Sequence, residues 1–325
     1  MPFEQPSLRV TVGGVVIPGA VSLKIESVGY FSADRFQLSF GMGAAAFATA
    51  GYFAALGLQT ITIEAALNGM GFAVLLIGQI DNIEIQFSEN LAVLSGRDLS
   101  AKLIDSEISE TFANQTASQI ATTLAGRHQL AANVTPTATQ VGQYYELDHA
   151  RNALGLHSRM TTEWNLLCSL AQAENFSLSV TGTTLNFGPY PSAASVSVSP
   201  QNFISLSIDI AASLPTRAVV KSWNTRSKAA SAEVQGNGPS TTLIRPNLTA
   251  AQAKAFAANH LASIRQHGTM LLGTMPADTT LMPGMALALS GTQSPLDQNY
   301  LVVAMARMLE AKSGFLQTVR AYAIA

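Results

Sequence analysis

The segment GRDLSAKLIDSE places Arg97 beside Asp98 and adds Asp105 and Glu107 shortly after them. Two carboxylates can hydrolyse a glycosidic bond when they face each other across a substrate, about 5 to 9 Å apart. If the segment is helical, Asp98 and Asp105 share one face, so the spacing permits such a pair. Lys102 would then lie within one turn of both carboxylates and neutralise them. A helix cap at Asp98 and a solvent-exposed charged face explain the same residues without catalysis.

A second pattern with possible chemistry is rich in small residues. Gly41, Gly43 and Ala46 match the G-x-G-x-x-A spacing of a dinucleotide-binding turn, and Glu64 follows at about the distance of the acid that binds the ribose. The preceding DRFQLSF alternates polar and apolar residues, whereas a Rossmann strand, covered on both faces, is continuously apolar. The pattern therefore favours a connection between two strands. A cofactor-binding enzyme is the alternative, and we expect no cofactor.

The histidines and the single cysteine do not have the spacing of a metal site. His149 and His157 occur in one segment, and His260 and His267 are seven residues apart on a predicted helix. Zinc-binding helices usually place two ligands four residues apart with a third group nearby. We therefore predict histidines of a core or an interface and no metal. Cys168 lies on an apolar helical face and is expected to be buried rather than nucleophilic.

The composition is poor in charge. Charged residues make up 12% of the 325 residues and hydrophobic residues 48%, against about 25% charged residues in an average soluble domain. This leaves too few charges to cover a free monomer, so either a membrane or other subunits must cover apolar surface. The longest apolar run, FAVLLIG, is far shorter than the ~18 residues that a span needs, and the start lacks a signal peptide. We predict subunit interfaces, no membrane segment and synthesis in the cytoplasm.

The net charge of −2 also bears on partners. A chain without a basic field has little to hold a phosphate backbone, so direct nucleic-acid binding is not expected. A single cysteine excludes an internal disulfide and a cysteine-based zinc site.

Strand patterns dominate the first part of the chain. Apolar residues alternate with polar ones from Leu8 to about Ser95, as in strands with one buried face. The pair Gly13-Gly14 suits a tight hairpin turn, and further turns are predicted near Asp81-Asn82 and Glu89-Asn90. Such a run of short strands predicts an antiparallel barrel or sandwich.

Helical periods appear after this β-rich part. Thr116 and Gln119 have the spacing of a capping box, and so do Thr249 and Gln252 at the head of an Ala-rich helix that extends to about His267. The segment TTEWNLLCSLAQAEN predicts another helix, followed by a hairpin around Gly182. The inward residues of that helix are Trp164, Leu167, Cys168 and Ala171, and Asn175 is placed to end it in the left-handed conformation.

These patterns predict an α+β fold that is mostly β, with two antiparallel β-barrel-like domains flanking a mixed α/β domain. The first β domain spans residues 1–96 and the α/β domain residues 97–190. The segment GPYPSAASVSVSPQ, rich in Pro and Ser, marks the next boundary. The second β-barrel-like domain spans residues 191–325 and contains the long helix near 249–267.

The order of several segments resembles the late control D proteins, which are baseplate hubs of contractile phage tails related to the hub half of type VI secretion spike proteins. The segments are LSGRDLSAKLIDSEI, TFANQTASQIATTLAGRHQL, TEWNLLCSLAQAENFSLSVTGTTLNFGP, LMPGMALALSG, NYLVVAMARMLE and FLQTVRAYA. The resemblance covers nearly the whole chain. Family members often have a glycine where this chain has Gln129, and a histidine where it has MARMLE.

The resemblance implies a homotrimeric ring in which two similar β-barrel domains per subunit meet a hexameric tail tube on one face and a trimeric spike on the other. Gly96, Arg97 and Asp98 would form the turn from the first barrel into the middle domain. Together with Trp164 they would be structural residues, with no catalytic, cofactor or metal role. The expected location is the virion tail baseplate, with the tube protein, the spike and other baseplate proteins as partners.

Two alternatives stay open at this point. The first is the hub of a related machine: a type VI-like apparatus, a tailocin or a noncontractile tail. The second is a cell-wall hydrolase of the tail tip, in which Asp98, Asp105 or Glu107 would be catalytic.

Overall fold

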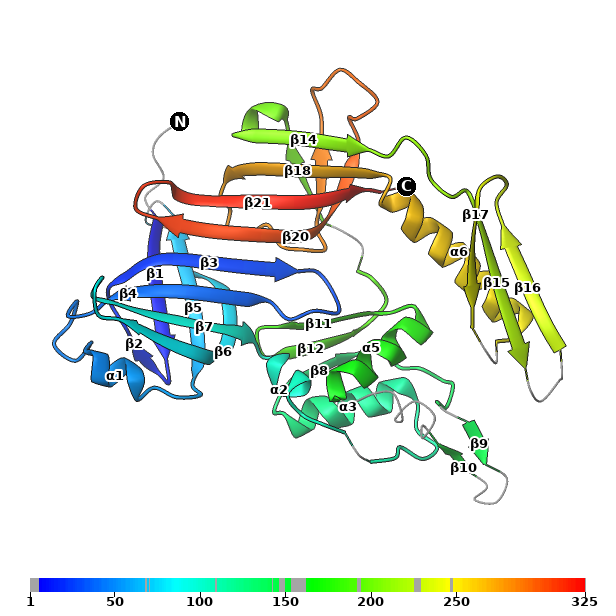
Figure 1. The fold of residues 1–325 in the computed structure, drawn as a ribbon, viewed down its shortest axis with the longest axis horizontal. Helices are drawn as coiled ribbons and strands as arrows, with labels where there is room; N and C mark the ends of the chain where they lie inside the picture. Colours follow the sequence, from blue (N-terminus) through cyan, green and yellow to red (C-terminus); the bar gives the residue numbers. More distant parts are fainter. Residues whose placement is uncertain are drawn as a thin grey trace. The chain divides into compact units, whose positions relative to one another are not determined.

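The protein consists of two compact units that share strands. The computed structural model describes residues 6–67, 69, 71–108, 110–141, 143–145, 150–152, 162–191, 194–224, 229–245 and 248–324. Unit 1 comprises Met1–Ser192, Pro276–Pro283 and Ala304–Gln317, and unit 2 comprises Ala193–Met275, Gly284–Val303 and Thr318–Ala325. Strands β20 (Asn299–Glu310) and β21 (Gly314–Ala323) therefore contribute residues to both units (Figure 1).

An antiparallel sheet forms the first part of unit 1, with the strand order β20-β3-β4-β7-β6-β5-β1-β2. Its strands are β1 (Pro6–Val12), β2 (Val15–Val16), β3 (Ala20–Val28), β4 (Arg35–Gly41), β5 (Thr60–Leu67), β6 (Ala73–Gln86) and β7 (Leu91–Asp98). Alternate residues such as Leu23, Ile25 and Leu38 are buried, as the period of two predicts. The short helix α1 (Ala50–Ala54) adds Phe53 to the same core.

Two of the three predicted turns in this sheet are confirmed. Gly13 and Gly14 have positive φ of 55° and 87° between β1 and β2, and Asn90 has a φ of 56° between β6 and β7. The turn predicted at Asp81-Asn82 is wrong, because β6 continues through it. The register of β6 against β7 shifts between Ile80 and Asn82, so a β-bulge accommodates the extra polar residue and the strand continues.

The second part of unit 1 packs helices on one face of a three-stranded sheet. Its strands, in the order β11-β12-β8, are β8 (Ala131–Val134), β11 (Ser177–Thr181) and β12 (Thr184–Gly188). The helices are α2 (Ala101–Ile104), α3 (Ala117–Arg127) and α5 (Glu163–Glu174), and β9 (Gln143–Tyr145) pairs with β10 (Ala150–Asn152). Leu124, Leu167, Leu178 and Phe187 are fully buried in their common core.

The predicted helix ends are confirmed in this part. Thr116 and Gln119 form both bonds of a capping box at the start of α3. Asn175 ends α5 with a φ of 57°, in the left-handed conformation. Gln129 also has a positive φ, of 59°, at the position where the resembled family often has glycine. A side chain with a Cβ is strained there.

Unit 2 contains a β-rich part and a small α/β part. The first has β13 (Ser195–Val198), the 3₁₀ turn Pro200–Asn202, β14 (Ser205–Ile210), β18 (Thr269–Pro276) and β19 (Ala286–Leu289), with the order β14-β18-β21-β20 and β19 beside β20. The second has β15 (Arg217–Asn224), β16 (Ala229–Gln235), β17 (Ser240–Ile244) and helix α6 (Ala250–Gln266). Thr249 and Gln252 form the predicted capping box of α6.

The fold is mostly β with few helices and a large antiparallel sheet, as predicted from the sequence. The barrels are a correction, because the strand order of the described residues is open at both ends and no sheet in that part of the chain closes on itself. The strands at the two open ends are β2 and β14, which do not pair with each other as a closed barrel would require. No helix of the described residues has the length and hydropathy of a membrane span.

Candidate functional site

Arg97 links three elements at the point where the first sheet ends. From β7 its guanidinium donates to both carboxylate oxygens of Asp81 on β6, at 2.6 and 3.1 Å. The same group donates to both oxygens of Asp105, at 3.0 and 2.8 Å, just after α2. These acceptors, first of all Asp81, raise the pKa of Arg97 above its ordinary value. Two-pronged bonds of this kind fix direction as well as distance, so Arg97 holds α2 against the sheet.

Asp98 holds the loop between β3 and β4. One carboxylate oxygen accepts from the backbone N–H of Asp34 at 3.0 Å, and the backbone N–H of Asp98 donates to the Asp34 carbonyl at 3.0 Å. The other oxygen accepts from the N–H of Ser100 at 2.9 Å and from its hydroxyl. Asp34 in turn accepts from the N–H of Val28 at 2.8 Å. Both carboxylates therefore serve backbone donors, as turn and cap residues do.

The same two carboxylates have raised pKa values. Burial raises the pKa of Asp34 to about 7, and the nearby Asp98 carboxylate adds to the rise. Burial also raises the pKa of Asp98, while the bonds from Ser100 and from the Asp34 N–H oppose the rise. Arg307 on β20 is fully buried near this pair, and its burial lowers its pKa to about 10. Its guanidinium donates to the carbonyls of Asp278, at 3.1 Å, and Leu281.

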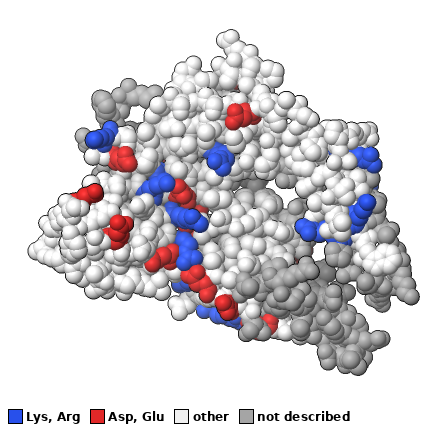
Figure 2. Space-filling view, in the orientation of Figure 1, with Lys and Arg blue, Asp and Glu red and all other residues white. Residues whose placement is uncertain are grey.

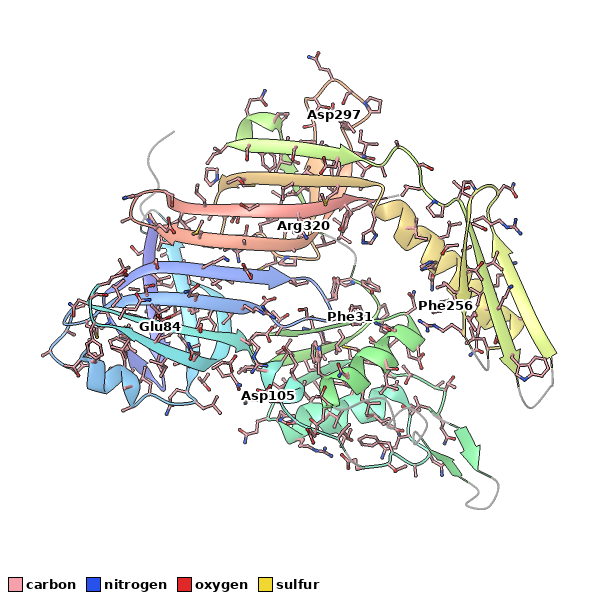
Figure 3. The ribbon with its side chains drawn as sticks, in the orientation of Figure 1. Phe31, Glu84, Asp105, Phe256, Asp297 and Arg320 are labelled. Carbon is pink, nitrogen blue, oxygen red and sulfur yellow. The ribbon has the colours of Figure 1, made fainter. Side chains whose placement is uncertain are left out.

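Trp164 holds the same loop from the other side. Its indole N–H donates to the Phe31 carbonyl at 3.4 Å, and the Phe31 N–H donates to the Leu178 carbonyl of β11 at 2.9 Å. Phe31 packs against the α/β core with a φ of 64° (labelled in Figure 3). Trp164 is 4% exposed. Asp98 and Trp164, far apart in the sequence, thus anchor the two ends of one connection.

The carboxylate pair considered for hydrolysis does not form. Asp98 is the last residue of β7, and the helix α2 begins only at Ala101, so Asp98 and Asp105 do not share a helical face. Lys102 was expected to neutralise them, but its ammonium group donates to the carbonyl of His128 at 3.4 Å. Arg97 takes that role for Asp105, since its guanidinium donates to both carboxylate oxygens. Glu107 is exposed and pairs through its backbone with Thr162.

The sequence patterns did not predict a buried glutamate and its ion pairs. Glu163, the first residue of α5, is 1% exposed and accepts from Arg127 at 2.6 Å and from the ring of His128. Arg127 also pairs with Glu110 at 2.6 Å. An acid in the first turn of a helix is a common surface feature, so its spacing gave no sign of burial. The ion pairs of Glu163 tie the end of α3 to the start of α5.

The other sequence candidates lie apart. Gly41 ends β4, whose neighbours β3 and β7 are antiparallel, and the next helix is the five-residue α1, so no dinucleotide fold surrounds the Gly41 to Ala46 turn. Burial raises the pKa of Cys168 to about 11, far from that of a reactive thiolate. His267 stacks on Tyr322. His149 and His157 lie outside the described residues. No group of three His, Cys, Asp or Glu in the described ranges could hold a metal ion.

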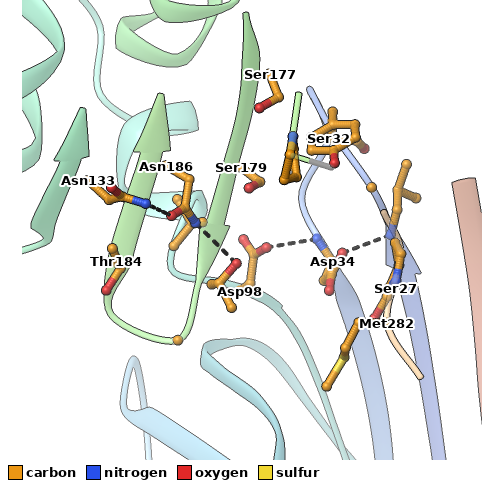
Figure 4. Close-up of a pocket in the computed structure, with 18 of the residues that line it drawn as sticks. Ser27, Ser32, Asp34, Asp98, Asn133, Ser177, Ser179, Thr184, Asn186 and Met282 are labelled. Carbon is orange, nitrogen blue, oxygen red and sulfur yellow. Dashed lines mark hydrogen bonds between the residues drawn. The ribbon is translucent and has the colours of Figure 1, made fainter. Parts of the chain in front are cut away.

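A cleft of about 770 Å³ lies within unit 1. The ends of β3 and β7 and the first half of β6 line one side of it, and the β11–β12 hairpin lines the other. Figure 4 shows Ser177, Ser179 and Asn186 of the hairpin facing Asp34 and Asp98 across this space.

The cleft combines uncharged polar side chains and two carboxylates with apolar residues, among them Val74, Leu76 and Ile77 of β6. Alternate residues of β11, β12 and β8 present small polar side chains to it, because the opposite face of this sheet packs on the helices. Asn133 donates to Asn186 at 2.9 Å. The lining contains no Lys, Arg or His. Both of its carboxylates, Asp34 and Asp98, already accept backbone hydrogen bonds.

Solved structures share the fold of nearly the whole chain. The 43 kDa tail protein of prophage MuSo2 from Shewanella oneidensis matches with a TM-score of 0.74 and 16% identity, covering 98% of each chain. The tail protein from Neisseria meningitidis matches with a TM-score of 0.71 and 17% identity, covering 98% of this chain and 96% of that one. No protein-family model and no curated protein matches the sequence.

A third similar structure comes from a secretion machine. The E. coli c3393 protein has a TM-score of 0.62 and 13% identity, and the match covers 97% of this chain and 77% of that one. It is a component of the type VI secretion system with structural similarity to the T4 bacteriophage tail proteins gp27 and gp5. The chain thus has the fold of phage tail proteins and of this secretion component, which confirms the resemblance at that level.

Proposed function

We propose that this protein is a structural tail protein, the baseplate hub that joins a hexameric tail tube to a trimeric spike as a homotrimeric ring. The observation that carries the proposal is the match of the fold from end to end with a prophage tail protein, over 98% of both chains. The location that follows is the virion tail baseplate.

The composition supports a permanent assembly. With 12% charged residues, the surface has little to keep a free monomer in solution. Interfaces of obligate complexes commonly bury more than about 2,000 Å² and are more apolar than ordinary surface. Two similar β-rich parts in each subunit would let three copies present a sixfold surface to the tube and a threefold surface to the spike.

Within this proposal Gly96, Arg97, Asp98 and Trp164 are scaffold residues. A Cβ at Gly96 would lie 2.0 Å from the Gln79 carbonyl oxygen, so only glycine permits that approach of β7 to β6. Arg97 and Asp98 fix the passage from the sheet into the α/β part, and Trp164 anchors the loop on its far side. None of the four has a free reactive group. We assign no enzymatic step, cofactor or metal to the protein.

A hub of a type VI-like apparatus is the second candidate, because a component of that secretion system shares the fold. The two candidate functions imply the same subunit fold and differ in the tube protein that the hub binds. Binding to a tail tube protein from the same gene cluster, or to a secretion tube protein, distinguishes them.

The mass of the purified protein tests the proposal. Light scattering should give three times 34.2 kDa for the protein alone, or three copies of it in a complex with the tube protein. Electron microscopy should show a ring with threefold symmetry on the end of the tube. A monomer in both conditions would overturn the hub assignment. A fixed dimer or hexamer would also contradict it, because neither matches a trimeric spike.

A further inference from the structure

Charge is divided unevenly between the two units. Only three acids, Asp209, Glu233 and Asp297, belong to unit 2. Residues 217–266, which form β15, β16, β17 and α6, are named the basic lobe here. Its cations in the sequence are Arg217, Lys221, Arg226, Lys228, Arg245, Lys254 and Arg265. In Figure 2 the coloured side chains over this part of the chain are blue, whereas red and blue alternate over β3, β4 and β7. An asymmetry of this kind indicates a surface for an acidic partner.

The lobe leaves one face of its sheet open. The strand order is β16-β15-β17, and α6 covers one face (Figure 1), where Ala218 and Val220 are buried against Ala257 and Leu261. Alternate residues of a strand point to opposite faces. Arg217, Val219, Lys221 and Trp223 of β15 therefore lie on the side away from α6.

That open face combines exposed apolar groups with cations. Arg217, Lys221 and Trp223 are exposed, Trp223 by 52%. Ile244 of β17 is the register partner of Lys221 and is 74% exposed. Protein interfaces are enriched in tryptophan and arginine, and this face presents Trp223 and Arg217 together with the exposed Ile244.

The cations of this face have no ion-pair partner in the described part of the chain. Every salt bridge found among the described residues lies in unit 1, and neither Arg217 nor Lys221 takes part in one. An exposed cation gains little from an isolated surface pair, but several unpaired cations of one sign attract a surface of the opposite sign.

A complementary surface exists in the same sequence. The end of β6 and the turn that follows it, residues 84–89, are named the acidic turn here and have Glu84 and Glu89 on either side of Phe87 in the sequence. Phe87 is 78% exposed, and both glutamates are exposed without a salt bridge among the described residues (Glu84 is labelled in Figure 3). The turn contains no Lys or Arg. The exposed apolar side chain of Phe87 and the two acidic side chains match the apolar and basic groups of the lobe.

We propose that the acidic turn of one copy docks on the open face of the basic lobe of the next copy. Phe87 packs against Trp223 and Ile244, while Glu84 and Glu89 face Lys221 and Arg217 of the neighbour. The two patches differ, so the contact is head to tail, and repeating it with a closing rotation gives a ring. This assignment rests on the proposed ring and names a surface that holds it together.

Cysteine cross-linking between copies tests the contact directly. In a Cys168→Ala background, one preparation carries Phe87→Cys and the other Trp223→Cys. After mixing and mild oxidation we expect a disulfide-linked dimer that contains one chain of each kind, because a disulfide needs Cβ atoms about 3.5 to 4.5 Å apart. The matched control replaces Leu58, which is 74% exposed and outside the acidic turn, with cysteine in place of Phe87. This control should give no mixed dimer with Trp223→Cys.

Charge reversal provides a second test, which needs no cysteine substitutions and measures the protein concentration at half-assembly. Arg217→Glu with Lys221→Glu should raise the protein concentration at half-assembly roughly tenfold or more, since four like charges would then meet. Adding Glu84→Lys and Glu89→Lys to the same chain should restore assembly toward the wild-type concentration, because every contact of the ring then joins opposite charges again. Lys254→Glu, an exposed change on α6, should leave it unchanged.

The outcomes separate this inference from the proposed function. The docking surface is wrong if the wild type is a trimer, the charge reversals leave its assembly unchanged and the cysteine variants form no mixed disulfide. The hub proposal would still stand in that case. A wild-type monomer, alone and with the tube protein, overturns both. Binding of a fluorescent single-stranded oligonucleotide that Lys221→Glu abolishes, with the mass of the assembly unchanged, assigns the open face to nucleic acid instead and also refutes the contact.

Discussion

The side chain of Asp34 makes the free energy of unfolding depend on pH. The folded pKa of about 7 stands above the ordinary value of 3.8, chiefly because of burial. Below pH ~4 the carboxyl is protonated in the folded and the unfolded chain, so its contribution to stability is fully present. As the pH rises toward 7, the unfolded chain ionises first, and the folded state progressively loses that contribution.

Asp34→Asn should therefore change how the free energy of unfolding varies with pH, and it should not lower that free energy equally at every pH. The amide oxygen can still accept from Val28, and the amide does not ionise. We expect the free energy of unfolding of the variant, relative to wild type, to rise between pH 4 and pH 7.5 by up to about 4 kcal/mol. Urea unfolding at several pH values measures it. Asp209→Asn, on an exposed strand residue, is the control, and identical profiles for wild type and Asp34→Asn would contradict the prediction.

Residues that cap their own neighbours could be predicted from the sequence, whereas residues with distant partners could not. Thr116, Gln119 and Asn175 act within one helical turn, so spacing alone specifies their bonds. Asp98 meets Asp34, and Glu163 meets His128, only after the fold has formed. Local spacing carries no information about such partners.

At the scale of elements, Arg97 is the tie between β6, β7 and α2. Its side chain is 25% exposed and Asp81 and Asp105 both accept from it. Arg97→Ala should lower the free energy of unfolding by about 1 to 2 kcal/mol, since the two freed acids become accessible to water rather than being trapped. Chemical denaturation followed by circular dichroism measures the change.

Arg35 is the matched control for this tie. It lies directly opposite Arg97 on β4, is exposed, and has no ion-pair partner among the described residues. Arg35→Ala removes the same side chain from the same sheet face and should change the free energy by no more than about 0.5 kcal/mol. Equal losses for the two variants would show that Arg97 contributes nothing beyond an ordinary surface arginine.

The elements themselves followed from period and turn chemistry where these agreed. The hairpin at Gly13-Gly14 and the helix after Thr249 formed as predicted. The turn at Asp81-Asn82 failed because two polar residues look alike in a turn and in an exposed bulge, and the pairing with β7 decides between them. The cleft and the link through Phe31 depend on two sheets approaching each other, which no local pattern records.

At the scale of the whole molecule, each of the two units is built from segments that are separated in the sequence. Local sequence patterns do not predict this arrangement. Patterns divide the chain at residues 96 and 190, because composition and period change there. The structure returns Pro276–Pro283 and Ala304–Gln317 to unit 1, since β20 pairs with β3 near the start of the chain. Pairing at so long a separation is set by the whole fold and costs loop entropy that only the full core repays.

This arrangement predicts that the units unfold together. Tyr300 is fully buried in the unit 2 part of β20, and the same strand continues to pair with β3 in unit 1. Tyr300→Ala should cost about 3 to 5 kcal/mol and release that strand from both cores. The chain has two tryptophans, so Trp223→Phe leaves Trp164 as a reporter inside unit 1. In that background, Tyr300→Ala should lower the urea midpoint seen by Trp164 fluorescence as much as the midpoint seen by circular dichroism. A Trp164 transition that stays at its original midpoint while the circular dichroism transition moves would mean that unit 1 keeps its core without β20.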